Sequence, residues 1–365
     1  MRLHNHWWLL IWPLLYGVLC HFINNKQEET IDGKRTVRWK YLFAFLMVVP
    51  LVIWAGWRVH FGDTEMYRST FKSLPSSLSQ IGGYMETVKK GFVFRLIELL
   101  FKCLISQSDV SFFVFVAIIQ IVCLVYIYRR YSSDYWLSMF LFVASTDYLS
   151  WMHNGIRQFI AASIVFLCVP LIAKKRYLPA VIIILFSAQI HSSALIVLPF
   201  VFIINGKAWN YKTLLFMLGI IIAIVFVDNV VDFIAESMED TEYERDIVYL
   251  RNNDGTNIFR VLFYSVPALM SLVFRSYIER ANDPLINVCV NLAIVTTGFY
   301  IFSFYTSGIL MGAIPIYFSL SNYILIPWLL GEVFNENSAK YLKTAFIVVY
   351  SVFFYYQCGP TWGLL

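Results

Sequence analysis

Charged residues are scarce in this chain. Lysine, arginine, aspartate and glutamate make up 14% of its 365 residues, whereas 59% of the residues are hydrophobic and 18% are aromatic. Soluble proteins are roughly 45–50% apolar and about a quarter charged, so no soluble domain of this size needs so apolar a composition. The scarcity of charge excludes an ordinary soluble domain and indicates that a bilayer is the solvent for most of the chain.

Motifs for cofactors are missing as well. The six cysteines mostly lie within or beside apolar runs, with no C-x-x-C pair and no histidine cluster at metal-ligand spacing. Neither a Walker nor a Rossmann glycine pattern is present. We therefore expect no metal site, no cofactor and no nucleic-acid partner. Because no internal repeat, low-complexity tract or Gly/Ser linker occurs, we predict one transmembrane domain over residues 1–365.

The sequence is dominated instead by long apolar segments. Such segments, about 15 to 20 residues each, recur along the chain, as helices in a bilayer require, since lipid offers no partner to unpaired backbone groups. The pattern predicts an all-α, polytopic membrane protein with about ten full spans. The expected spans are 7–23, 41–57, 110–128, 135–149, 155–173, 213–227, 258–274, 285–304, 311–330 and 341–356.

The distribution of basic residues predicts the orientation. They cluster at 26–40, 129–130 and 174–176, which the positive-inside rule places in the cytoplasm, so the N-terminus is expected outside. Residues 177–204 form an apolar stretch that is too long for one ordinary span and rather short for two. As a single crossing they would move the later basic residues to the other side of the membrane. As a hairpin they keep these residues cytoplasmic, and we prefer this interpretation.

The preferred orientation leaves external segments at about 58–109 and 228–257, with the apex of the hairpin 177–204 near residues 189–193. Within the first external segment, "GFVFRLIELLFKCL" carries Arg95, Glu98 and Lys102 at i, i+3 and i+7. This spacing predicts an amphipathic helix, which we expect to lie on the outer membrane face.

Arg157 stands at the expected external start of an apolar span. His153 at i−4 and Asn154 at i−3 would share one helical face with it, and Gln158 is adjacent. Together with the free N–H groups and the positive dipole of a helix N-terminus, these side chains suit a phosphate or diphosphate. The alternative is an interfacial arginine that extends to lipid headgroups.

His191 interrupts an apolar run at the apex of the predicted hairpin, where a polar group is costly unless it has a partner or a task. One interpretation is a neutral histidine that is hydrogen-bonded to a neighbouring serine or a carbonyl. The other is a residue that transfers a proton or contacts phosphate on the same side as Arg157. Both interpretations stay open.

The stretch "FGDTEMYRSTF" follows the second span. Its carboxylates Asp63 and Glu65 can coordinate a divalent ion, or one can act as a base toward a hydroxyl, although Asp63 can equally cap the helix that follows. Tyr67 and Arg68 are further candidate substrate contacts. So is Arg260, which enters a span from the second external segment.

Four stretches in this order carry a family resemblance: "GDTEMYRSTF", "GFVFRLIELLFK", "NGIRQFIAASIVFLCVPLIAKKRY" and "FSAQIHSSALIVLPFVFI". Over roughly residues 41–330, the chain resembles the EpsG/Wzy-like family of membrane polymerases of exopolysaccharide, capsule and O-antigen. The most specific parts are the block at 154–158 and the histidine of "QIHSSALIVLP".

The resemblance implies a glycosyltransferase-type polysaccharide polymerase with a GT-C-like architecture in the bacterial cytoplasmic membrane. The implied substrate is an oligosaccharide repeat unit on undecaprenyl diphosphate, which is polymerised at the outer face. Membrane lipid is an implied partner, and a chain-length regulator and a flippase are partners that the resemblance leaves open.

The resemblance also implies roles for individual residues. Arg157 would hold the diphosphate leaving group, and His191 would assist at the acceptor hydroxyl or the phosphate. Asp63 is the alternative base. The late span lacks the further basic residue that related polymerases often have, so Arg260 or Arg68 would substitute for it.

Two other classes stay open beside the polymerase. A flippase of the lipid-linked oligosaccharide would show polar residues along mid-membrane spans and two matching halves, which this sequence does not show. A membrane acyltransferase that modifies the polysaccharide would use the same external polar groups with an acyl donor from the cytoplasm.

Overall fold

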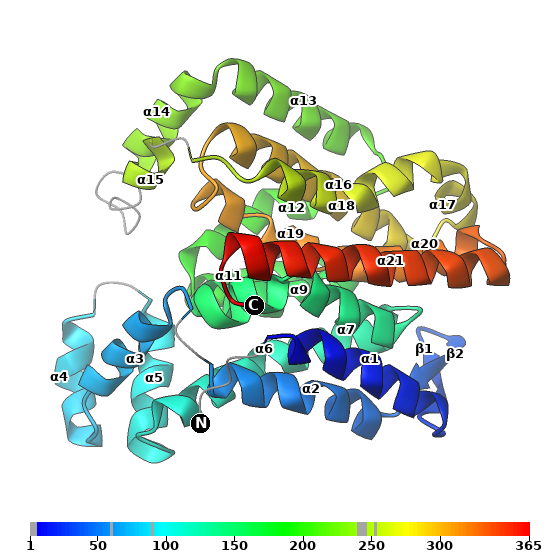
Figure 1. Cartoon of the computed structure of the whole chain (residues 1–365). Coiled ribbons are helices and arrows are strands. Elements are labelled where there is room, and N and C mark those ends of the chain that lie inside the picture. Colours follow the sequence, from blue (N-terminus) through cyan, green and yellow to red (C-terminus); the bar gives the residue numbers. More distant parts are fainter. Residues whose placement is uncertain (1–5, 59–60, 89–90, 239–246, 252–253) are drawn as a thin grey trace. The chain divides into compact units, whose positions relative to one another are not determined.

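The computed structural model describes residues 6–58, 61–88, 91–238, 247–251 and 254–365 (Figure 1). The chain divides into two compact units. The first comprises Met1–Ile164, Phe186–Ser192 and Leu330–Leu365, and the second comprises Val165–Leu185 and Ser193–Leu329. The single transmembrane domain and its external segments stay predictions.

Apolar helices that overlap the predicted spans make up most of the first unit. α1 (Trp8–His21) packs on α7 (Tyr135–Ala144), and α2 (Tyr41–Gly56) packs along α6 (Asp109–Tyr131). α21 (Glu336–Tyr356) also contacts α7. The long helix α6 therefore has a fixed partner over much of its length.

The second unit is organised around α18 (Pro284–Tyr305), most of whose side chains are buried. The helix begins sharply because the Asp283 carboxylate accepts the backbone N–H of Leu285 at 2.8 Å and a proline occupies the first turn. Its helical neighbours are α10 (Cys168–Ala173), α13 (Tyr211–Val225), α16 (Ile258–Val273) and α19 (Ile316–Ser319). Other helices here are α12 (Val197–Ile203), α14 (Val227–Met238), α15 (Ile247–Arg251) and α17 (Arg275–Ala281). α20 (Asn322–Val333) begins in this unit, and its residues from Leu330 on belong to the first.

The all-α class needs one correction. The segment between α1 and α2, where basic residues cluster, forms an antiparallel hairpin of β1 (Lys26–Ile31) and β2 (Lys34–Trp39). An Asp32-Gly33 pair joins the strands, and Asp-Gly between two extended segments is a strong hairpin signal. The remainder of the described structure is mostly helical.

The predicted hairpin at 177–204 has a break in the expected place. α11 (Tyr177–Ala188) ends three residues before the 3₁₀ turn η3 (Ser192–Ile196), which leads into α12. The backbone N–H of His191 bonds to the carbonyl of Ser187 at 3.0 Å, so the chain turns directly after the helix. His191 thus lies between two short apolar helices.

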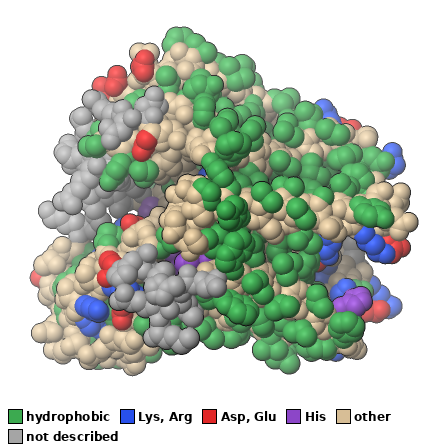
Figure 2. Space-filling view, in the orientation of Figure 1, with side chains coloured by type: hydrophobic (Ala, Val, Ile, Leu, Met, Phe, Trp, Pro, Cys, Tyr) green, Lys and Arg blue, Asp and Glu red, His purple; other side chains and the backbone are tan. Residues whose placement is uncertain are grey.

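Membrane-spanning length is reached by fewer helices than the sequence predicted. Among the described residues, α6, the run Ile156–Ala173 and α18 are long and apolar enough to cross a membrane, and the number rises to 6 if each of three bent helix pairs is one span. Figure 2 shows hydrophobic side chains over α1, α2 and α21, with charged side chains beside the β-hairpin. Val18 of α1 is 60% exposed and Val352 of α21 is 61% exposed, which suits contact with lipid. About ten spans and a GT-C-like architecture stay predictions.

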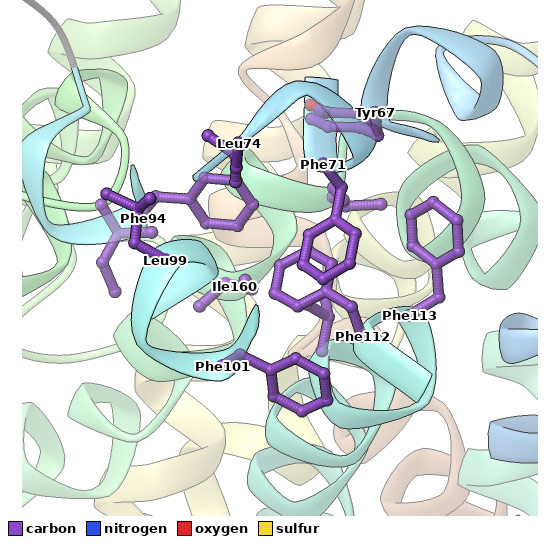
Figure 3. Packing of buried hydrophobic residues seen from close by; sticks show 12 residues of the cluster. Tyr67, Phe71, Leu74, Phe94, Leu99, Phe101, Phe112, Phe113 and Ile160 are labelled. Atoms are coloured by element: carbon purple, nitrogen blue, oxygen red, sulfur yellow. The ribbon is translucent and has the colours of Figure 1, made fainter. Parts of the chain in front are cut away.

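An aromatic core holds together the segment between α2 and α6. This segment forms α3 (Thr64–Ser73), the 3₁₀ turn η1 (Leu78–Gln80), α4 (Ile81–Glu86) and α5 (Phe92–Leu104). Phe71 of α3 stacks on Phe112 of α6 with ring centroids 4.8 Å apart, and Phe101 of α5 meets Phe112 edge-on at 5.4 Å (Figure 3). Such pairs add to the free energy of burying the rings, so α3 and α5 are fastened to the start of α6.

The amphipathic helix α5 is confirmed, but its charged face is oriented differently from the prediction. Glu98 is fully buried and Lys102 is 7% exposed, so these charges point inward and not toward water. The Lys102 ammonium donates to the carbonyls of Phe71, Lys72 and Leu74 at 2.8, 2.8 and 2.6 Å. Of these carbonyls at the end of α3, the one of Phe71 also accepts the backbone N–H of Leu74 at 3.3 Å. Lys102 supplies the further donors that the helix end needs.

Replacing Lys102 should therefore loosen this segment. We expect Lys102→Met to lower the free energy of unfolding by about 3 kcal/mol, because three carbonyls, two of them in buried bonds, lose a charged donor. Thermal unfolding of the purified protein in detergent checks this, with Lys72→Met as the control because Lys72 is exposed on the same helix end. Equal melting temperatures for the two variants would contradict the role given to Lys102.

Candidate functional site

Arg157 occupies the first turn of α9 (Ile156–Phe166), as the sequence predicted, and lies half-buried. The start of α5 approaches it closely. A Cβ atom built at Gly91 would lie 3.0 Å from Arg157 Nη1, and the guanidinium is 6.0 Å from the ring centroid of Phe94. Two segments far apart in the sequence therefore meet at this arginine.

Tyr67 of α3 lies within reach of the Arg157 charge. Its side chain is 7% exposed and packs in the aromatic core (Figure 3). Burial raises the pKa of Tyr67, so the hydroxyl stays protonated and keeps its own donor. We call the group formed by Asp63, Tyr67, Glu98, Arg157 and His191 the Arg157 site, because the arginine charge acts on each of the other four.

Asp63 enters the site through a backbone bond. Its N–H donates to Asn154 Oδ1 at 2.9 Å, which ties the residue before α3 to the turn before α9. Asp63 stands at the N-cap position, but its side chain makes no capping bond, so the simple capping interpretation is wrong. Desolvation raises the pKa of the exposed Asp63 carboxyl, and the nearby Arg157 charge opposes this.

His153 and Arg157 do not share one helical face. Residues Ser150–Asn154 form a short π-helical turn, and Gly155 breaks the helix before α9 begins, so the spacing rule for one helix does not apply. His153 is 1% exposed and its ring packs edge-on against Tyr148 with centroids 5.1 Å apart. It is a core residue in this structure, whereas Gln158 is half-buried directly after Arg157.

Arg68 is occupied by acidic partners. Its Nη1 lies 2.7 Å from Glu65 Oε1, and its Nε lies 3.1 Å from Asp109 Oδ2 at the start of α6. Its Nη2 donates to the carbonyl of Arg58 at 2.9 Å. The Arg68–Asp109 pair therefore links α3 to α6, and the acidic partners leave Arg68 poorly suited to a diphosphate.

The sequence analysis did not single out Arg58, which is 1% exposed. Its guanidinium stacks 3.7 Å from the ring centroid of Phe113, and its Nη1 donates to the carbonyl of Met152 at 2.6 Å. Arg58 thereby holds the π-helical turn that precedes Arg157. The signal in the sequence that points to Arg58 is its position directly after an apolar span.

The sequence pattern indicates Glu98 as one of the charged residues of an amphipathic helix, but not as a site residue. Its Oε2 accepts from Arg95 Nη1 at 2.5 Å, whereas its Oε1 is buried without a hydrogen-bond partner among the described residues. Burial raises the pKa of Glu98 to about 7, and the charges of Arg95 and Arg157 oppose the increase. The site thus contains a carboxyl group that changes its charge near neutral pH.

Arg260 belongs to the second unit, in the first turn of α16. Its guanidinium lies 5.7 Å from the ring centroid of Tyr264 and 5.9 Å from that of Tyr300. These two rings stack on each other with centroids 4.6 Å apart. The role of Arg260 as a second diphosphate contact stays a prediction.

Metal ligation was one interpretation of Asp63 and Glu65. In the parts of the chain that the structure describes, no three His, Cys, Asp or Glu side chains form a group that could hold a metal ion. Glu65 instead pairs with Arg68. The Arg157 site combines a half-buried arginine, two carboxyl groups and an imidazole, which is suited to binding an anion and to moving a proton.

The apolar helices and their lipid-compatible surfaces define an integral membrane protein. The chain belongs to the EpsG family, whose sequence model matches residues 41–358, and this family is associated with polysaccharide biosynthesis. The family resemblance is thereby confirmed over a somewhat longer range than 41–330. No curated protein and no solved structure matches the chain.

The charge state of Glu98 can be measured directly. Infrared difference spectra between the wild type and Glu98→Gln should show a carboxylic acid C=O band that fades as the pH rises through about 7, the pKa expected for this buried group. In an Arg157→Gln background the band should persist to higher pH, because the positive charge that favours the carboxylate is gone.

Glu65→Gln serves as the matched control, since the Glu65 side chain is 54% exposed. Its difference spectrum should show no acid band at neutral pH. An acid band of Glu98 that has vanished by pH 5 would contradict the desolvated environment.

Proposed function

We propose that this protein polymerises lipid-linked oligosaccharide repeat units at the outer face of the bacterial cytoplasmic membrane. The donor would be a glycan on undecaprenyl diphosphate and the acceptor a hydroxyl of another lipid-linked unit. Membership of the EpsG family supports the polysaccharide class. The reaction type, glycosyl transfer with a diphosphate leaving group, is inferred from the arrangement of side chains around Arg157.

The leaving group explains the arginine. When the acceptor oxygen bonds to the anomeric carbon of the donor, the bond from that carbon to the diphosphate oxygen breaks and the diphosphate departs with the electron pair. A planar guanidinium can donate two parallel hydrogen bonds to phosphate oxygens. Arg157 lies against the start of α5, at Gly91 and near the ring of Phe94, so little rearrangement is needed as this charge develops.

Asp63 is our choice for the base that takes the proton of the acceptor hydroxyl. Its carboxylate is exposed to an incoming glycan, whereas Glu98 is fully buried. The partial desolvation that raises its pKa also makes it a better proton acceptor than a fully hydrated aspartate. His191 would contact the phosphate or the acceptor from the break after α11.

Glu98 would adjust the charge of the site. When it is protonated, the positive charges of Arg95 and Arg157 are less compensated, which favours the anionic donor. When it ionises near pH 7, its negative charge neutralises part of the positive charge of these arginines, which weakens their attraction for the diphosphate.

This gives a prediction on pH dependence. Binding of a lipid diphosphate diester should weaken as the pH rises through about 7 in the wild type, and Glu98→Gln should remove this dependence because residue 98 then stays neutral. Such a diester has no group of its own that titrates near neutral pH. Titration of the purified protein with the lipid at several pH values checks this, and an unchanged pH profile in the variant would contradict it.

The function itself is tested by the chain length of surface glycan. Cells that lack the protein should carry single repeat units, and complementation with the wild type should restore long chains. Arg157→Ala should lower the rate of polymerisation about 100-fold, because one donor to the developing anion is removed. Arg157→Lys should recover part of it, since it keeps the charge but loses the two-pronged geometry.

Arg280→Ala is the matched control, since Arg280 is an exposed arginine of α17 in the second unit. Polymer that persists without the protein would refute the proposal. Lipid-linked units that accumulate in the cytoplasmic leaflet alone would favour a flippase instead.

A further inference from the structure

A second polar feature of the first unit lies at the other end of α6. A cavity of about 1000 Å³ is lined by α1, by the β-hairpin, by the turn between α6 and α7 and by α21. Its polar wall includes Lys26, Arg38, Arg129 and Lys343, with Asp134 as the acidic lining residue. We call it the basic cavity.

Two of the four basic residues already have acidic partners. Arg129 is 2% exposed, forms an ion pair with Glu29 and donates through Nε to the carbonyl of Trp39 at 2.6 Å. Lys343 forms an ion pair with Asp134. These pairs fix the wall of the cavity but leave little net charge of their own.

Lys26 and Arg38 supply the uncompensated charge. Among the described side chains, no carboxylate lies within ion-pair distance of either residue. Arg38 Nη1 donates to the carbonyl of Ser132 at 2.9 Å, and its Nε is buried with no hydrogen-bond partner in the described part of the chain. Holding positive charges near Arg129 costs free energy that a bound anion would recover.

The rest of the wall is apolar. Leu15, Val18 and Ile347 line the same cavity, and the first two are 50% and 60% exposed on α1. A ligand that fits must therefore combine an anionic group with an apolar chain. A phospholipid with a phosphate in its headgroup has this combination, and basic pockets at the cytoplasmic ends of membrane helices suit such headgroups.

The position of the cavity separates it from the Arg157 site. Arg68 of α3 pairs with Asp109 at the first residue of α6, and Arg129 lies twenty residues further along the same helix. At 1.5 Å per residue this is about 30 Å, the thickness of the hydrocarbon core. The two regions therefore lie at the two ends of one membrane-length helix.

We propose that the basic cavity binds the phosphate headgroup of an anionic lipid, with Lys26 and Arg38 on the phosphate and an acyl chain along the apolar surface of α1. The headgroup would lie in the leaflet opposite to the Arg157 site. This proposal does not depend on the reaction that the Arg157 site performs.

Binding of defined lipids to the full chain tests the proposal. Purified protein in detergent is titrated with phosphatidylglycerol, with zwitterionic phosphatidylcholine and with inorganic phosphate, and bound lipid is counted by native mass spectrometry. We expect phosphatidylglycerol to bind and phosphatidylcholine to bind weakly. Inorganic phosphate that displaces phosphatidylglycerol at equal concentration would overturn the lipid assignment in favour of free phosphate.

The variants identify the site. Lys26→Gln should weaken phosphatidylglycerol binding about fivefold, and the double change with Arg38→Gln about 30-fold, as expected for one and two charges near an anionic headgroup. The exposed Lys26 can be replaced without disturbing a buried contact. Arg35→Gln is the control, because this exposed arginine of β2 does not line the cavity. An equal loss in the control and in the double variant would overturn the proposal.

Discussion

Burying Glu98 beside two arginines is the constraint on which the Arg157 site depends. A carboxylate removed from water is strongly destabilised unless a positive charge or a proton compensates it. Arg95 satisfies one oxygen, and the charge of Arg157 favours ionisation from a greater distance. The start of α5 must therefore stay against α9, since moving it away would leave Glu98 with less compensation.

The same requirement explains why the charged stripe of α5 faces inward. Four residues after Glu98, Lys102 donates to three carbonyls at the end of α3. One helical face thus joins Arg157 through Glu98 and α3 through Lys102, while Phe101 packs against Phe112 of α6. Polar and aromatic contacts together make α3, α5 and the start of α6 one rigid support for the arginine.

Sequence reasoning predicted the elements of this support better than their contacts. Apolar runs located the long helices, and the break near His191 followed from the length of the apolar stretch and from the basic residues that the hairpin keeps on one side. The i, i+3, i+7 spacing of Arg95, Glu98 and Lys102 predicted an amphipathic helix, but periodicity cannot say which face is buried when both faces have partners. The direction of α5 depended on carbonyls at the end of α3 that no local pattern reveals.

The turn before Arg157 shows a second reason why the contacts in the structure differ from those predicted from the sequence. Spacing placed His153 and Arg157 on one face, but this rule holds only within a continuous helix. Gly155 interrupts the helix, and buried Arg58 holds the turn through the carbonyl of Met152. His153 is consequently buried with Tyr148, and Asn154 is left to bind the backbone of Asp63.

Two glycines allow the backbone to come this close. A Cβ at Gly62 would lie 2.0 Å from Asn154 Oδ1, and one at Gly91 would lie 3.0 Å from Arg157 Nη1. Both residues have positive φ, 50° and 61°, which side chains with a Cβ rarely adopt. Each stands just before a helix, α3 or α5, and each abuts the turn at 154–157. The Arg157 site therefore depends on two glycines whose backbone lies directly against the side chains of Asn154 and Arg157. This close approach sets the positions of the charged side chains.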